Sequence, residues 1–176
     1  MKVICISGKA QHGKDTLAGL LKKHLEDQGN KVLVAHFGDL VKYICEKFFD
    51  WDGQKDEKGR TLLQYVGTDV VRKQEPNFWT DFIKNVLTLF SDEWDHVLIP
   101  DCRFPNEIEC FKDCGFNAHL VRITRPNYDS GLTEQQLKHP SETAMDNYQA
   151  DCYVINDSTL NNLDAQIPMI LKTIGG

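Results

Sequence analysis

Short apolar runs alternate along this chain with segments in which apolar residues recur every three or four positions. The runs are typical of buried strands and occupy residues 2–7, 32–35, 97–100, 118–123 and 153–155. The helical spacing predicts a first helix that ends near Gln28 and an amphipathic closing helix from Leu160 to Ile174. Alternating strands and helices predict an α/β fold built on a mostly parallel sheet.

Two further segments interrupt this pattern. Residues 38–95 are largely helical in pattern and contain a polar loop at 50–59, whereas residues 124–142 are polar, carry Pro126, Gly131 and Pro140, and predict a mobile loop. A chain of 176 residues is one domain by length. We therefore expect a single domain with core segments 1–37, 96–123 and 150–176, a helical insertion at 38–95 and a lid loop at 124–142.

One helix of the insertion carries most of its aromatic residues. Asn77 is suited to cap the helix start. Apolar residues then recur at helical spacing, which predicts a buried face made of Phe78, Phe82, Val86 and Phe90. Trp79 lies off this stripe, so it is a candidate for stacking a nucleotide base.

Composition narrows the possible partners. The net charge of −6 argues against a nucleic-acid backbone as the main ligand, because such surfaces need a basic footprint. No apolar run approaches the roughly 20 residues of a membrane span, and the amino-terminal segment lacks the features of a signal peptide, so we expect a cytoplasmic protein. The six cysteines form no Cys-x-x-Cys pair, which favours structural thiols over a metal site.

The segment between the first strand and the first helix has the pattern of a phosphate-binding loop. It reads Gly8-Lys9-Ala10-Gln11-His12-Gly13-Lys14. Strand, glycine-containing loop and helix in this order place backbone N–H groups and a helix N-terminus around phosphate oxygens, with Lys14 reaching the β- and γ-phosphates. Asp15 stands where Ser or Thr usually ligates Mg²⁺, and Thr16 follows it. The alternative is an ordinary turn before a helix.

Several charged residues beyond this loop are candidates for a second ligand. Asp101 follows a strand directly, where an Mg²⁺-organising carboxylate would lie; the alternative is a helix-cap or turn aspartate. Arg103 can grip a phosphate in bidentate fashion, or pair internally with Glu107. Arg72 and Lys42 are either further phosphate contacts or ordinary surface cations.

The lid loop contributes a second set of charges. Arg122 and Arg125 lead into it, and Lys138, His139 and Glu142 lie within it. Cations on a loop that closes over a nucleotide can neutralise the charge of a moving phosphoryl group. A solvated loop with no role in binding is the alternative.

Taken in order, these motifs resemble the deoxynucleoside monophosphate kinases of bacteriophages. The resemblance rests on Gly-x4-Gly-Lys-Asp-Thr at 8–16, Phe-Gly-Asp-Leu-Val-Lys at 37–42, Gly-Thr-Asp-x-x-Arg at 67–72 with Trp79 after it, Asp-x-Arg-Phe-x-Asn-Glu at 101–107 and His-x-Ser-Glu at 139–142. It implies an adenylate-kinase-like P-loop NTPase fold of three layers with an acceptor-binding insertion and a lid. It also implies transfer of the γ-phosphoryl group of ATP, with Mg²⁺, to a deoxynucleoside monophosphate. The family pattern does not place the polar loop around 50–57.

Under this resemblance, each candidate residue has an expected role. The catalytic residues would be Lys14, Arg103 and Arg125. ATP would bind residues 9–16, namely Lys9, Ala10, Gln11, His12, Gly13, Lys14, Asp15 and Thr16. The acceptor would bind Asp39, Lys42, Arg72, Trp79, Arg103 and Glu142, and Mg²⁺ would bind Asp15 and Asp101. The expected partners are the two nucleotides and, in a homodimer, a second copy of the chain; no nucleic acid or membrane is expected.

Three alternatives to this interpretation remain open. A phosphomevalonate kinase of the animal type shares a similar Lys-Asp P-loop but takes a non-nucleotide acceptor. A P-loop switch would hydrolyse NTP without an acceptor, although the chain lacks an Asn-Lys-x-Asp motif for reading guanine. A non-catalytic binding module would result if Asp15 disabled the Mg²⁺ chemistry.

Overall fold

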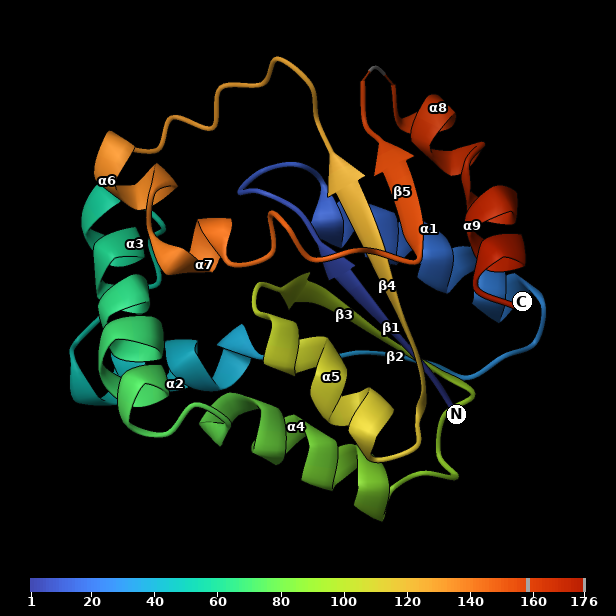
Figure 1. The fold of residues 1–176 in the computed structure, drawn as a ribbon, viewed down its shortest axis with the longest axis horizontal. Helices are drawn as coiled ribbons and strands as arrows, with labels where there is room; N and C mark the ends of the chain where they lie inside the picture. Colours follow the sequence, from blue (N-terminus) through green and yellow to red (C-terminus); the bar gives the residue numbers. More distant parts are fainter. Residues whose placement is uncertain (158, 176) are drawn as a thin grey trace.

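The strands of the chain form one parallel sheet. The computed structural model describes residues 1–157 and 159–175. Within these residues the sheet has five strands in the order β2-β3-β1-β4-β5 (Figure 1). They are β1 (Lys2–Ser7), β2 (Val32–Val34), β3 (His96–Cys102), β4 (Asn117–Thr124) and β5 (Cys152–Ile155). Every predicted strand is therefore present, with ends that differ by a residue or two, and β3 continues through Asp101 to Cys102.

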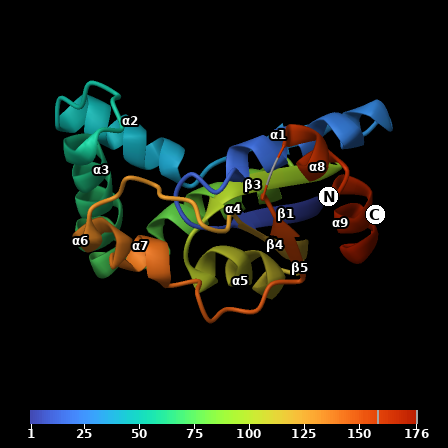
Figure 2. The same ribbon diagram turned by 90° about the horizontal axis from the view of Figure 1, so that it is seen from above.

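Helices cover both faces of this sheet (Figure 2). One face carries α1 (Lys14–Asp27), α8 (Leu160–Asp164) and α9 (Ile167–Thr173), and the other carries α4 (Phe78–Leu89) and α5 (Pro105–Asp113). Successive residues of β1 point to opposite faces. Ile4 and Ile6 accordingly pack with α1, whereas Val3 and Cys5 pack with α5. The three-layer α/β fold is confirmed.

The first part of the predicted insertion lies beyond the carboxyl ends of the strands, and its last helix, α4, returns along one face of the sheet (Figure 1). The insertion contains α2 (Gly38–Phe48), α3 (Glu57–Gln64), a π-helix η1 (Tyr65–Arg72) and α4. The lid segment carries two short helices, α6 (Glu134–Leu137) and α7 (Pro140–Thr143), which lie beside α3 in both views. The amide of Gln136 donates to Glu57 O and to Thr61 Oγ1, each at 3.3 Å. The lid is thus partly helical and attached to α3, whereas the sequence predicted only a mobile loop.

The closing segment is two helices rather than the single helix predicted. The α8 helix ends at Asp164, and α9 begins at Ile167 with Pro168 in its first turn. Proline lacks a backbone N–H and fits the first turn of a helix, so it starts a new helix here instead of continuing the old one. Leu160 is consequently 58% exposed, while Ile167 and Ile170 are buried.

The prediction of the buried face of α4 is wrong. Phe78, Phe82 and Phe90 are 45%, 50% and 52% exposed, whereas Trp79 is 2% exposed. A second set at the same spacing, Trp79, Ile83 and Leu87, packs into the core instead. Both faces of the helix are apolar, and helical spacing alone cannot decide which one the sheet covers.

Four of the six cysteines are packing residues, whereas Cys114 is exposed. Cys5, Cys45, Cys102 and Cys152 are buried free thiols. Across the described residues no group of three or more His, Cys, Asp or Glu side chains is arranged to hold a metal ion. None of the helices in residues 1–157 and 159–175 combines the length and apolar character that a membrane crossing requires.

Candidate active site

The P-loop has the geometry of an anion-binding turn. It connects β1 to α1, and Gly8 has φ of 155°. A Cβ atom on Gly8 would lie 2.4 Å from the carbonyl oxygen of Ile123 on β4, so only glycine fits at this position. Gly13 precedes α1, and the first N–H groups of this helix are oriented toward the loop.

Lys14 is the buried cation of this loop. Its Nζ donates to Gly8 O at 2.7 Å and to Lys9 O at 2.9 Å, and the residue is 8% exposed. Burial lowers the pKa of Lys14 to about 8, and the nearby Arg103 guanidinium adds to the shift. An anion that binds next to this ammonium group would therefore stabilise its charged form.

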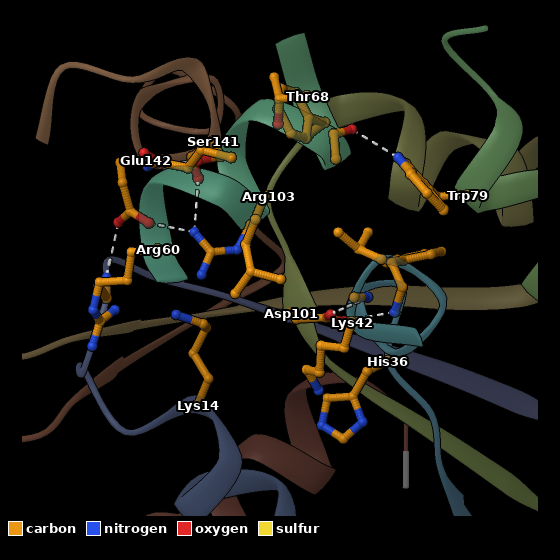
Figure 3. Close-up of a pocket in the computed structure, with 18 of the residues that line it drawn as sticks. Lys14, His36, Lys42, Arg60, Thr68, Trp79, Asp101, Arg103, Ser141 and Glu142 are labelled. Atoms are coloured by element: carbon orange, nitrogen blue, oxygen red, sulfur yellow. Dashed lines mark hydrogen bonds and ion pairs between the residues drawn. The ribbon is translucent and has the colours of Figure 1, made fainter. Parts of the chain in front are cut away.

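Glu142, on α7 of the lid, connects the P-loop to the opposite wall (Figure 3). Its Oε2 accepts from Ala10 N at 2.9 Å, and its Oε1 forms an ion pair with Arg103 Nη1. The same Nη1 donates to Ser141 O at 3.1 Å. One carboxylate thus binds both a P-loop N–H group and an arginine, two donors that could also bind phosphate oxygens.

Arg72 forms a second cationic wall at the end of η1. It pairs with Glu107, donates to Asn106 Oδ1 at 3.0 Å, and its Cζ lies 4.0 Å from the centre of the Phe104 ring. Its Nε atom is buried and has no hydrogen-bond partner among the described residues. A buried donor without a partner is uncommon, and Arg72 also lines the cavity described below.

Glu107 organises the loop after β3. Burial raises its pKa to about 7, against the opposing charge of Arg72. Its Oε2 accepts from Arg103 N at 2.6 Å and from Phe104 N at 3.0 Å. The alternative in which the Arg103 side chain pairs with Glu107 is therefore wrong: Arg72 takes that carboxylate, and Arg103 pairs with Glu142.

A chain of charged groups begins at Asp15 and follows the start of α2. His36 Nε2 lies 3.3 Å from Asp15 Oδ1, and His36 Nδ1 lies 3.4 Å from Asp39 Oδ2. The hydrogen bond between Asp15 and His36 lowers the pKa of Asp15 and raises the pKa of His36. Lys42 Nζ in turn lies 2.7 Å from Asp39 Oδ1.

Asp101 positions the start of α2. Its Oδ1 accepts from Phe37 N at 3.1 Å and its Oδ2 from Gly38 N at 2.8 Å. The carboxylate therefore caps a helix. That helix is α2, which follows β2, and not α5, which follows Asp101 in sequence. The interaction joins the insertion to the central strands.

The other residues predicted to bind ATP or to act in catalysis lie at the edge of these groups. Lys9 pairs with Asp146 at 2.5 Å. Arg125 N donates to His12 Nδ1 at 3.2 Å, and the Arg125 guanidinium lies 3.9 Å from the centre of the Tyr128 ring. Thr16 is exposed on α1.

Most of the groups described above surround one cavity of about 420 Å³. Among the predicted site residues, its walls include Ala10, Gln11, Lys14, Asp15, Lys42, Arg72, Trp79, Asp101, Arg103 and Glu142. The predicted residues that lie outside its lining are Lys9, His12, Gly13, Thr16, Asp39 and Arg125. The cavity therefore extends from the P-loop to both arginines, and the indole N–H of Trp79 donates to Gly67 O at 2.8 Å beside it.

Sequence reasoning missed several residues of the lining. These are His36, Lys55, Arg60, Gln64, Thr68, Leu132 and Ser141. A signal existed for His36, which directly follows the predicted strand 32–35. Arg60 had none, because a single arginine after a polar loop resembles any solvated cation.

Comparison with known proteins identifies the family. The family model described as deoxynucleotide monophosphate kinase matches residues 41–167. The chain belongs to this family. The match begins after the P-loop, so the P-loop geometry and the family signal support the same conclusion from separate parts of the chain.

Viral relatives agree with the assignment. A putative deoxynucleotide monophosphate kinase of Acanthamoeba polyphaga mimivirus is 28% identical over 95% of this chain and 94% of the relative. The deoxynucleotide monophosphate kinase of Enterobacteria phage T4 is 27% identical over 65% of this chain, which corresponds to 46% of the phage protein. The match thus spans less than half of the phage enzyme's length and nearly all of the mimivirus protein.

Solved structures support the fold alone. The APS kinase of Mycobacterium tuberculosis has a TM-score of 0.54 at 15% identity, covering 99% of this chain and 98% of that one. The shikimate kinase of Aquifex aeolicus has a TM-score of 0.53 at 17% identity, covering 100% of both chains. Membership of the deoxynucleotide monophosphate kinase family makes this chain an ATP-dependent kinase of nucleoside monophosphates, as its motifs predicted.

Proposed function

We propose that this kinase transfers the γ-phosphoryl group of ATP to a 2′-deoxynucleoside monophosphate in the presence of Mg²⁺. The observation that carries the proposal is the continuous cavity, which joins Lys14 of the P-loop to Arg72 and Arg103. A kinase of this kind must hold two anionic groups in line and stabilise charge as the phosphoryl group moves. A monophosphate oxygen is already a nucleophile, so no general base is needed.

In this proposal the donor binds the P-loop, residues 9–16. Its backbone N–H groups and Lys14 contact the β- and γ-phosphates. Arg125, at the start of lid 124–142, approaches the donor from the other side. Its position next to His12 supports that role.

The acceptor is assigned to insertion 38–95 and the loop after β3. Arg72 and Arg103 bind its phosphate, and Lys42, Asp39 and Glu142 surround it. The unpaired Nε of Arg72 supports this assignment, since a phosphate oxygen would satisfy a donor that the chain leaves buried and unbonded.

The donor set of the site fits Mg²⁺ held partly by substrate. Mg²⁺ usually binds one or two carboxylates together with phosphate oxygens and water, so a cluster of protein ligands is not required. The Asp15 side chain is 84% exposed and lines the cavity, which leaves its carboxylate accessible. Asp15 would hold the ion with the donor phosphates, and Asp101 would contribute through its remaining lone pairs; the ion would neutralise phosphate charge.

Selectivity for the sugar is assigned to Trp79. Its indole N–H is already used by Gly67 O, so the ring offers the cavity only apolar surface. A 2′-hydroxyl against such a surface would be buried without a partner, which costs ~1–3 kcal/mol or roughly ten- to a hundredfold in discrimination. Two other aromatic residues of the insertion, Phe78 and Tyr65, could also be considered for this role, but they are 45% and 52% exposed and do not line the cavity.

The deciding experiment is a panel of deoxy- and ribonucleoside monophosphates, each incubated with ATP and Mg²⁺ and scored for the diphosphate. We expect acceptor-dependent ADP formation, with a higher kcat/KM for each deoxy compound than for its ribo partner. Equal values would leave a general nucleoside monophosphate kinase. ADP release without any acceptor would indicate an NTP switch, and phosphorylation of a phosphorylated alcohol alone would indicate a phosphomevalonate-kinase-like enzyme.

A homodimer remains our prediction for the assembly. The exposed face of α4, formed by Phe78, Phe82, Leu89 and Phe90, is the surface to which we assign it. Exposed apolar patches of this kind commonly mark contact sites between proteins.

A further inference from the structure

The part of the polar loop 50–59 that precedes α3, residues 50–56, is not placed by the family resemblance and ends next to the P-loop. It leads into α3, and it brings Lys55 and Arg60 to the lining of the main cavity together with Lys14 and Asp15. Both cations also line a second cavity of about 260 Å³, which shares Gln11 of the P-loop. Two cations from the insertion therefore lie near the donor side of the site, and Arg60 is visible there in Figure 3.

The loop is held by its own contacts. Trp51 Nε1 donates to Gln54 O at 2.9 Å, and Asp56 Oδ1 accepts from Gly59 N at 2.8 Å. A Cβ atom on Gly59 would lie 1.9 Å from Gln54 O and 2.7 Å from Trp51 Nε1. Glycine at this position in α3 is what allows the loop to fold back closely onto the helix.

The same contacts fix Arg60. Its Nε donates to Lys55 O at 2.9 Å, which binds the arginine to the loop and leaves the two terminal nitrogens for other partners. From the other side, Gln136 of the lid donates to Glu57 O and Thr61 Oγ1 on α3. Loop, helix and lid thus present these cations as one unit.

In the part of the chain that the structure describes, neither of these two cations is held in an ion pair, unlike three other cations of the cavity. Arg72 pairs with Glu107 and Arg103 with Glu142, while Lys42 pairs with Asp39. Among the described residues, neither Lys55 nor Arg60 has an ion-pair partner within 4.0 Å. The pKa of Asp15 is lowered mainly by its hydrogen bond to His36, and the charge of Lys55 makes a smaller contribution in the same direction. Lys55 is therefore close enough to the P-loop to interact with Asp15 electrostatically.

We propose that Lys55 and Arg60 bind the terminal phosphate of the donor and the phosphoryl group in transfer. The inference deepens the proposed function and rests on it. In the step, the bond between the γ-phosphorus and the β,γ-bridging oxygen breaks, an acceptor phosphate oxygen bonds to the γ-phosphorus, and ADP leaves with the bridging electron pair. Negative charge shifts during this step onto oxygens that unpaired cations can stabilise.

The experiment compares two nucleotides that differ in the γ-phosphate. Calorimetry measures the affinity of the intact protein for ADP and for the non-hydrolysable ATP analogue AMPPNP, each with Mg²⁺, in Lys55→Ala, Arg60→Ala and the double variant. Lys58→Ala is the matched control, because Lys58 is exposed on the same first turn of α3 and lines neither cavity. Thermal unfolding of every variant verifies the fold, and Arg60→Lys retains the charge.

We expect the double variant to bind AMPPNP at least about tenfold more weakly and ADP less than about threefold more weakly, since a charge-assisted phosphate contact is lost only where a γ-phosphate exists. kcat should fall about a hundredfold, with partial recovery in Arg60→Lys. Equal losses for both nucleotides, or an AMPPNP affinity equal to that of the control, would overturn the inference. The binding ratio needs no acceptor, so it decides this inference even if the panel shows that the proposed acceptor is wrong.

Discussion

The titration of Lys14 gives the most direct test of the donor site. In the free protein, burial and the neighbouring Arg103 lower its pKa from 10.5 to about 8. A shift of this size corresponds to roughly 3 kcal/mol against the charged form of the lysine. ATP binds the charged form, because the ammonium group must meet the phosphate oxygens. The binding step should therefore weaken as the pH rises through the pKa of the free protein.

The expected magnitude follows from this pKa. About nine tenths of the protein carries charged Lys14 at pH 7, but only about a tenth does at pH 9. The kcat/KM for ATP should accordingly fall roughly tenfold per pH unit above pH 8. Bound phosphate raises the pKa of the lysine, so kcat itself should stay level to a higher pH.

The assay measures initial rates of ADP formation between pH 7.5 and 10 at saturating acceptor, with product separated after quenching. Circular dichroism at each pH confirms that the protein stays folded. Lys14→Arg is the control: arginine keeps its charge over this range, so its activity, at whatever level, should show no fall near pH 8. A level kcat/KM for the natural protein up to pH 10 would refute the assignment of Lys14 as the buried cation that binds ATP.

Four further changes test other parts of the site and the assembly. Lys14→Ala should lower turnover about a hundredfold, or ~3 kcal/mol of transition-state stabilisation, and a loss below about fivefold in folded protein would contradict the P-loop assignment. Asp15→Asn should weaken the Mg²⁺ dependence of the rate more than the affinity for ATP. An unchanged Mg²⁺ titration would indicate that Asp15 has a structural role instead. Arg103→Ala should raise KM for the monophosphate far more than KM for ATP, and equal effects would move it to the donor side. Phe82→Asp should shift sedimentation toward a monomer, and an unchanged oligomeric state would exclude this face of α4 as the interface.

The strands and the P-loop were predictable because their signals are local. A buried strand reads as a continuous apolar run, and a phosphate-binding turn needs its glycines and lysine at fixed spacing. The prediction for α4 failed because Phe82 and Trp79 lie on two apolar faces of one helix, and the choice between them depends on a sheet assembled from distant segments. Local pattern does not contain that information.

The ion pairs of the site were less predictable for the same reason. Glu107 is four residues from Arg103 in sequence, and yet it pairs with Arg72, which arrives from η1. Arg103 pairs instead with Glu142 from the lid. Such choices depend on how three separate segments meet at the carboxyl edge of the sheet, so the sequence could supply the candidates but not their partners.

The contact between Glu142 and the P-loop has a consequence for which anions the site accepts. Its carboxylate already engages Ala10 N and Arg103, so any incoming anion competes with a group tethered to the same chain at high effective concentration. A small anion such as inorganic phosphate would make few contacts beyond those that the carboxylate already makes, so replacing the carboxylate would yield little binding free energy. A triphosphate bound as proposed would reach Lys14 and the helix N-terminus as well, and those added contacts would allow it to displace the glutamate. The lid would then act as a built-in competitor that selects ligands by the number of phosphates they carry.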